Sequence, residues 1–376
     1  MPIYKQNQKN KDGVYKYKVR VNYVDGYGNK RQLTRVAYGL QEAKKLERAL
    51  SIQTEEKTIT KSITVNDLHK EYCDNMSHEL RKSSIFSKEK NYKNYISEYL
   101  GKKKISDLSV RVLTHWKNKL NKRDISTTTK KNAYSELKAT MNYAVHMEYI
   151  AINPLNKITT FKDAYEEEKN INFYTPEEFK KFKASALKIA TETGCYDFYV
   201  FFAIAYYTGC RKGEIHALRW SSIEDDYLKI TKSISQKLKG GDVETPPKNK
   251  SSVRTIQIPT PLLNILKEHK ERQQKAVKSI NQKWSDDAFI CGYNRPLRDS
   301  TIENMNKKIA EDAGIKKIRI HDFRHSHASL LINSGINALE VARRLGHSTV
   351  EQTLQTYSHL FPKESEKAIS ILNVIE

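Results

Sequence analysis

Two polar segments divide this chain into three parts, and they limit the folds open to it more than any other feature. Residues 54–62 and 156–173 carry few apolar side chains, and the second segment includes three consecutive glutamates. At 376 residues the chain is long enough for two or three domains, each with its own core. We therefore predict domains at residues 1–55, 63–156 and 174–376, separated by linkers.

The first part shows the alternation of a half-buried β-strand. From residue 14 to residue 23, aromatic and β-branched side chains alternate with mostly cationic ones. A turn is expected at 25–29, a second strand at 30–37 and a short opening strand near Ile3, which together predict a three-stranded sheet followed by a helix from about 41 to 52. Its cationic face is either an ordinary solvated surface or one that meets nucleic-acid phosphates. The cations on this face are Lys16, Lys18 and Arg20.

The second part is predicted to be a helical bundle. Apolar residues recur at helical spacing in several segments, which are about 64–78, 84–99, 107–120 and 126–149. The last segment contains a stripe that is typical of a core face and consists of Leu137, Met141, Ala144 and Val145.

The third part combines helices with a little β-structure. Thr175 to Glu178 has the pattern of a capping box with proline in the first turn, which marks a helix start. Residues 198–207 are the most apolar stretch here and predict a buried helix, whereas 227–235 and 253–258 have strand character around a hairpin. The chain is therefore predicted to be a multidomain protein, mainly α with small β-sheets, whose third domain is mixed α+β.

The balance of charge favours a polyanionic partner. Lys and Arg number 66 against 44 Asp and Glu, a formal net charge of +22, and such an excess is typical of proteins that bind nucleic acid. The four cysteines lie far apart without a CxxC pair, so neither a disulfide framework nor a zinc ribbon is indicated. No window approaches the roughly 18 apolar residues of a membrane span, and no signal peptide is apparent. We expect a soluble cytoplasmic protein.

An arginine follows the predicted buried helix, within the motif TGCRKGE at 208–214. A guanidinium at the start of a helix can bind two oxygens of a phosphate at once. An Arg beside a Glu is more often a structural ion pair, so both interpretations of Arg211 stay open on this motif alone.

Basic side chains cluster again in the motif HDFRH at 321–325. His321 and Arg324 are three positions apart, which places them on one face of a helix. His325 and His327 add imidazoles nearby, and we assign them supporting roles. A metal site is disfavoured because Arg324 lies within the cluster and would repel a cation.

The last motif, LGHSTVE at 345–351, combines a histidine with a helix start. Ser348 and Glu351 have the spacing of a capping box, so His347 is predicted to precede a helix N-terminus, where anions bind. Tyr357 follows ten residues after His347. Taken alone, Tyr357 would be interpreted as a packing residue.

Together these motifs closely resemble the active-site motifs of tyrosine recombinases, the family of phage and conjugative-transposon integrases. The order and spacing of Arg211, His321, Arg324, His347 and Tyr357 all match. The chain before residue 170 resembles, less closely, the arm-binding and core-binding domains of lambda-type integrases. The resemblance implies a site-specific DNA recombinase that requires no metal, ATP or other cofactor.

The resemblance also implies a role for each residue. Tyr357 would attack a DNA phosphodiester and form a 3′-phosphotyrosyl bond, with His321 as the base. Arg211 and Arg324 would hold the non-bridging oxygens, and His347 would hydrogen-bond the phosphate. A phenol with a pKa near 10 is a poor nucleophile at pH 7, so a base and nearby cations are required.

A lysine on a hairpin would protonate the leaving 5′-oxygen in this family, and we choose Lys248 over Lys250. The resemblance further implies a homotetramer on DNA, arm-type and core-type sites, and accessory bending or excision factors. The apolar side chains within 363–376 would dock either on a neighbouring protomer or on their own domain.

Two other functions share many of these features. A type IB topoisomerase uses the same chemistry without exchanging partners, but the predicted N-terminal sheet, suited to a second set of DNA sites, argues against it. A non-catalytic DNA-binding regulator would be expected to lack Tyr357 or one of the arginines, and all three are present.

Overall fold

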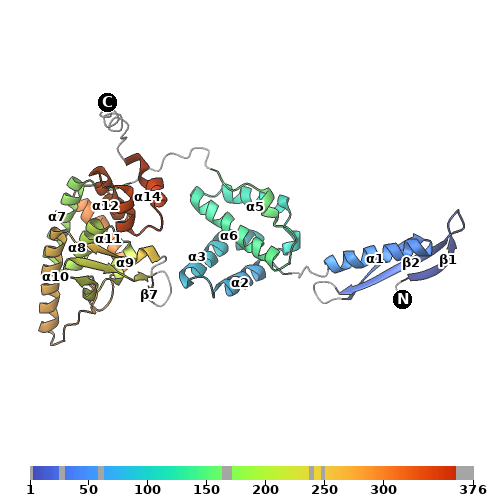
Figure 1. The fold of residues 1–376 in the computed structure, drawn as a ribbon, viewed down its shortest axis with the longest axis horizontal. Helices are drawn as coiled ribbons and strands as arrows, with labels where there is room; N and C mark the ends of the chain where they lie inside the picture. The colour runs from blue at the N-terminus through green and yellow to red at the C-terminus, as the bar shows by residue number, and fades with distance from the viewer. Residues whose placement is uncertain are drawn as a thin grey trace, which may run out of the picture. The chain divides into compact units, whose positions relative to one another are not determined.

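The fold is mostly helical, with small antiparallel sheets, as predicted (Figure 1). It divides into two compact units, Met1–Glu167 and Glu168–Glu376. The three domain boundaries expected from the sequence stay a prediction. The computed structural model describes residues 3–24, 30–57, 63–162, 172–236, 241–246 and 250–360.

The first unit begins with an antiparallel sheet in the order β1-β2-β3, followed by α1. Val19, Ala37, Ala43 and Leu50 form its core between sheet and helix. The cations Lys16, Lys18 and Arg20 alternate with this core face along β2, as the sequence predicts. The predicted turn at 25–29 lies outside the described residues. The elements are β1 Ile3–Lys9, β2 Tyr15–Val24, β3 Lys30–Tyr38 and α1 Leu40–Lys57.

The second part of this unit is the predicted bundle. Three of its helices, α2, α5 and α6, begin at side-chain caps: Thr64 accepts from the Asp67 amide, Ser109 from Val112, and Ser126 from Thr129. Leu137, Met141 and Ala144 are buried as expected, whereas Val145 is half-buried. A π-helical turn, Lys93–Ser97, joins α3 to α4 within the predicted segment 84–99. The helices are α2 Val65–Met76, α3 Lys82–Tyr92, α4 Glu98–Leu100, α5 Val110–Asn121 and α6 Thr127–His146.

The second unit is built around α8, which is buried along nearly its whole length. Helices α7, α10 and α12 pack against α8, so apolar side chains on every side of it are covered. The capping box predicted at Thr175 is present, because Glu178 accepts from the Thr175 amide at 2.9 Å and Thr175 accepts in return. The bounds are α7 Pro176–Thr193, α8 Tyr196–Thr208, α10 Thr260–Ser279 and α12 Asp322–Asn333.

Short strands lie beside this helical core. β4, β5 and β8 form one sheet, and β6 pairs with β7, so the predicted strand segment 227–235 contributes to two sheets. The bounds are β4 Ile223–Glu224, β5 Tyr227–Ile230, β6 Ser233–Ser235, β7 Val243–Thr245 and β8 Arg254–Gln257.

The last helices form a small core of their own. Ala328, Ile332, Val341, Leu345 and Tyr357 pack together, which brings α12, α13 and α14 into contact. The remaining bounds are α9 Lys212–Ala217, α11 Asp299–Asp312, α13 Ala338–Leu345 and α14 Val350–Tyr357.

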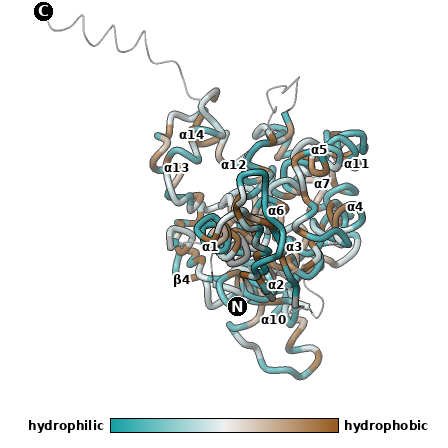
Figure 2. Tube along the Cα trace, turned by 90° about the vertical axis from the view of Figure 1, so that its right-hand side faces the viewer, coloured by the Kyte–Doolittle hydropathy of each residue, from teal (hydrophilic) through white to brown (hydrophobic). Residues whose placement is uncertain are grey.

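Hydrophobic and hydrophilic residues are interleaved along the trace (Figure 2). Within the part of the chain that the structure describes, every helix is too short or too polar to cross a membrane.

Candidate active site

The site is assembled where α8 ends. Gly209 adopts a left-handed conformation, with φ of 64°, and terminates α8. A Cβ at this position would lie 2.8 Å from side-chain carbons of His327 and of Leu345. Glycine therefore allows the end of α8 to meet the middle of α12 and the end of α13, and the next residues carry Arg211 into the site.

Arg211 makes the structural ion pair that its motif suggested, and it also reaches another motif. Its Nη1 donates to Glu214 Oε1 at 2.8 Å, and its amide donates to Glu214 Oε2 at 2.9 Å. Its Nη2 donates to the Gly346 carbonyl at 3.2 Å, beside His347. With 37% of its side chain exposed, Arg211 is held at both ends of the guanidinium yet remains accessible.

Arg324 is almost fully buried and directs its guanidinium to the first motif. Its Nη1 donates to the Gly209 carbonyl at 2.9 Å, whereas its buried Nη2 has no hydrogen-bond partner among the described residues. Burial, and then the charges of Arg211 and Arg254, lower the pKa of Arg324 to about 9. A buried cation with a spare donor and cationic neighbours is stabilised by an anion.

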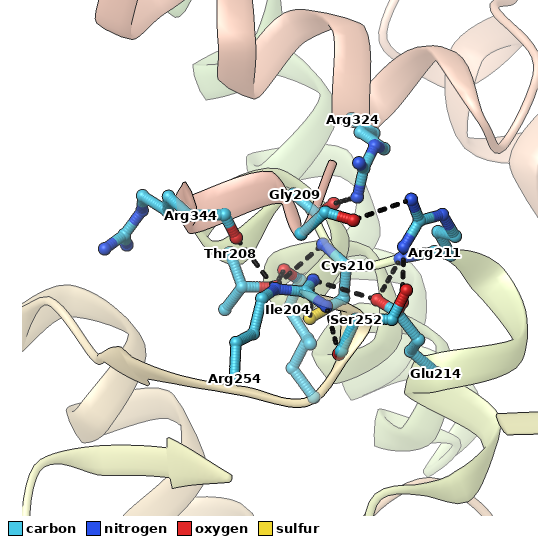
Figure 3. Close-up of polar contacts among 11 residues, drawn as sticks. Ile204, Thr208, Gly209, Cys210, Arg211, Glu214, Ser252, Arg254, Arg324 and Arg344 are labelled. Atoms are coloured by element: carbon cyan, nitrogen blue, oxygen red, sulfur yellow. Dashed lines mark hydrogen bonds and ion pairs between the residues drawn. The ribbon is translucent and has the colours of Figure 1, made fainter. Parts of the chain in front are cut away.

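Arg254 connects the strand β8 to these motifs, a role that sequence reasoning missed. Its Nη2 donates to Glu214 Oε2 at 2.9 Å, so Arg211 and Arg254 share one carboxylate (Figure 3). Its Nε donates to the Arg344 carbonyl at 2.8 Å and its Nη1 to the Ser252 carbonyl at 3.2 Å. These contacts hold β8, α9 and the end of α13 together. The only sequence signal was a cation at the start of a strand.

His347 lies between Gly346 and α14. Its Nδ1 is 2.7 Å from the hydroxyl of Thr353, which orients the ring. Burial, followed by Arg324 and Arg211, lowers the pKa of His347 to about 4. The predicted capping box of Ser348 with Glu351 is wrong: the N-cap is Thr349, one residue later, and Gln352 Nε2 donates to the Ser348 hydroxyl instead.

Tyr357 ends α14 with only 1% of its surface exposed. Its hydroxyl oxygen is 2.6 Å from Nδ1 of His325, and burial raises the pKa of Tyr357 to about 12. Among the described residues no hydrogen bond joins the hydroxyl to His321, the base expected from the resemblance. The sequence placed His325 in a supporting role because neither its spacing nor its motif singles it out.

His321 precedes α12 and lies beside the arginines. Loss of solvation and the positive charges of His325, Arg324 and Arg211 lower its pKa to about 4. The His321 side chain is nevertheless exposed to solvent. A phosphate bound beside it would offset the charges of the cationic neighbours and raise the pKa of His321 again.

His327 is structural, consistent with the supporting role assigned to it. Its Nδ1 is 2.8 Å from the Tyr206 carbonyl, which requires an N–H there, and its Nε2 accepts from Arg344 Nε at 3.1 Å.

Several predicted site residues cannot be placed. Lys248, the side chain of Lys250 and the segment 363–376 lie outside the described residues. Lys16, Lys18 and Arg20 are on the N-terminal sheet of the other unit. Within the described ranges, no three His, Cys, Asp or Glu side chains are grouped as metal ligands.

Comparison with known proteins decides the family. A model described as "Phage integrase family" matches residues 173–364, and "Phage integrase, N-terminal SAM-like domain" matches residues 64–121. The chain belongs to the phage integrase family. The ICEBs1 integrase of Bacillus subtilis is 30% identical over 96% of this chain and 97% of that protein. A tyrosine recombinase XerC-like protein of Caldanaerobacter subterraneus is 31% identical over 88% of each chain.

Solved structures of integrases share the fold. The Tn1549 transposon integrase in complex with transposon right end DNA has a TM-score of 0.67 at 19% identity, covering 81% of this chain and 98% of that one. A lambda integrase tetramer bound to a Holliday junction has a TM-score of 0.55 at 17% identity, covering 93% and 96%. The predicted family, the fold class and the enzyme class, a tyrosine-type site-specific recombinase, are confirmed.

Proposed function

We propose that this integrase cleaves and rejoins DNA through a covalent 3′-phosphotyrosyl bond at Tyr357, to integrate and to excise a mobile element. The observation that carries the proposal is the buried Arg324, whose unpartnered Nη2 lies in a cluster of cations that also includes Arg211. Such a cluster is preorganised for a phosphate, and α12 connects it to the phenol through His325.

In this proposal Arg211 and Arg324 bind the non-bridging oxygens and stabilise the charge that develops at phosphorus. His321 and His347 are further hydrogen-bond partners of the phosphate, and its negative charge would raise the lowered pKa of both imidazoles. Lys248 protonates the leaving 5′-oxygen. The bond energy is kept in the phosphotyrosine, so the reaction requires no metal and no ATP.

We propose three DNA-handling domains at residues 1–55, 63–156 and 174–376, the first for arm-type sites and the second for core-type sites. The Tn1549 and lambda structures contain DNA, and one lambda structure is a tetramer, which supports double-stranded DNA as partner and a homotetramer. Accessory bending or excision factors complete the assembly. The four cysteines are unpaired, which suits the reducing cytoplasm.

A suicide duplex, nicked beside the cleavage position so that the cut end diffuses away, tests the proposal. Wild type should form a covalent adduct that resists denaturant, and Tyr357→Phe should form none because the attacking oxygen is absent. Absence of adduct in wild type would leave a DNA-binding regulator, and equal adduct in Tyr357→Phe would show that another residue is the nucleophile. Recombination between two cognate sites separates the recombinase from a topoisomerase, which would relax supercoils only.

The cationic sheet face should contribute to the salt dependence of DNA binding. The register places Lys18 between Tyr4 and Val36, so the cations lie among exposed side chains on one surface. Removing a cation that neutralises one phosphate should reduce the slope of log K against log salt by about 0.9. We expect the triple alanine variant of Lys16, Lys18 and Arg20 to show a shallower slope on duplexes from the element's ends.

The matched control removes the same charge from α1, on the other side of the sheet, by replacing Lys44, Lys45 and Arg48 with alanine. This control should keep the wild-type slope. Equal slopes for the two triple variants would contradict a specific DNA-facing role for the sheet face.

A further inference from the structure

His325 and Tyr357 form a pair that the family assignment does not require. They are 32 residues apart, on α12 and α14, and their Nδ1 and hydroxyl oxygen are 2.6 Å apart. We propose that His325 is the proton acceptor for Tyr357 during DNA cleavage, and that His321 serves the phosphate instead. This inference rests on the proposed role of Tyr357 as nucleophile.

The first turn of α12 presents one imidazole to the phenol and another to the phosphate-binding side. His321 and His325 are one helical turn apart, and their rings meet edge to face with centroids 5.1 Å apart. The ring of His325 also contacts the ring of Tyr357, with centroids 5.6 Å apart. Arg324, between them in sequence, points to Gly209 and the phosphate-binding cluster. His325 therefore contacts the phenol, whereas His321 is exposed to solvent and accessible to the incoming DNA.

The protonation states suit this transfer. Burial lowers the pKa of His325; Asp322 opposes this shift and the charges of Arg319 and Arg324 add to it, so the imidazole is mainly neutral at pH 7. The phenol is protonated there, because burial raises its pKa to about 12. A phosphate entering the site would offset the arginine charges and make His325 a stronger base.

The proposed step moves one proton from Tyr357 to His325 and exchanges one P–O bond for another. The phenol O–H bond breaks and an N–H bond forms at Nδ1 of His325, whose accepting tautomer carries its proton on Nε2. The Tyr357 oxygen bonds to phosphorus, the bond to the 5′-oxygen breaks, and the hairpin lysine protonates that oxygen. In the joining step His325 returns its proton to the departing Tyr357. The charge of Arg324 favours the phenolate as it forms.

Single-turnover cleavage of the suicide duplex by His325→Ala and His325→Asn tests the step. Asparagine places an acceptor near the position of Nδ1 but is not a base. We expect both variants to cleave about a hundredfold slower or worse, with site binding unchanged, because general base catalysis typically contributes this much. If the Asn variant cleaves at a rate within a few-fold of wild type, His325 only positions the phenol. If the Ala variant cleaves faster than wild type, the contact with His325 holds Tyr357 in an inactive position. Either result overturns the proposal.

A more acidic phenol distinguishes loss of the base from damage to the structure in His325→Ala. With a fluorinated tyrosine in place of Tyr357, the nucleophile ionises more readily and needs its base less, so the defect of His325→Ala should shrink. A defect of unchanged size would mean damage to the structure and would overturn the proposal. Wild type and Tyr357→Phe in the same assay report on the nucleophile itself, so failure of the proposed function is seen separately.

Discussion

Arg324→Ala is expected to slow DNA cleavage by about a thousandfold or more while site binding stays within about tenfold. The Arg324 guanidinium is fixed by the Gly209 carbonyl and surrounded by protein, so it requires no reorganisation when charge develops on the phosphate. Arginines that act on phosphoryl transition states are worth about 10³ to 10⁵ in rate. Removal of such a group affects the transition state far more than the bound duplex.

The measurement pairs single-turnover adduct formation with a binding titration on an intact cognate duplex. Arg211→Ala should behave in the same way. Arg324→Lys is the sharper control, because lysine keeps the charge but cannot bind both the Gly209 carbonyl and a phosphate oxygen with a fixed fork. A collapse of binding in the alanine variants would show that both arginines are ordinary anchoring contacts.

Arg254→Ala is expected to act differently from these variants, through a large loss of stability of the folded protein. Glu214 is 3% exposed and shares its carboxylate between Arg254 and the more exposed Arg211. Removal of one partner of a buried ion pair typically costs about 3–5 kcal/mol, because the remaining charge is uncompensated. The carbonyls of Arg344 and Ser252 also lose their donor.

Urea unfolding of the second unit measures this effect, with Arg343→Ala as the matched control. Arg343 lies on α13 with 68% of its side chain exposed, so its removal should change the free energy of unfolding by less than about 0.5 kcal/mol. A similarly small loss for Arg254→Ala would show that Arg211 alone satisfies Glu214.

The same variant has a defined pH dependence. Burial opposes ionisation of Glu214, but Arg254 and Arg211 overcome it, and its pKa lies below the ordinary 4.5. A depressed folded-state pKa contributes stability that is present above pH 4.5 and is lost as pH falls through the folded value. Without Arg254 the pKa of Glu214 should rise, so its buried carboxylate should be protonated at a higher pH. The difference in stability between wild type and Arg254→Ala should therefore shrink as pH falls below 4.5.

Much of the fold follows from local patterns. The alternation along β2, the capping boxes at Thr64 and Thr175 and the apolar run of α8 are properties of neighbouring residues, because hydrogen bonds within helices and the pleat of a strand repeat over a few positions. The start of α14 was predicted one residue early, at Ser348. The competing contact of Ser348 with Gln352 depends on rotamers that spacing alone does not reveal.

By itself the sequence determined the family, which the comparisons confirm, and it predicted Arg211, His321, Arg324, His347 and Tyr357 as site residues, because their order and spacing are linear features. Only the tertiary structure decided which imidazole meets the phenol. That contact depends on how α12 and α14 pack around the small core of Ala328, Ile332, Val341 and Leu345. It also showed that Arg254, 40 residues from Glu214 and 90 from Arg344, joins them. Contacts at such separations are set by the packing of whole elements, and no local pattern in the chain records them.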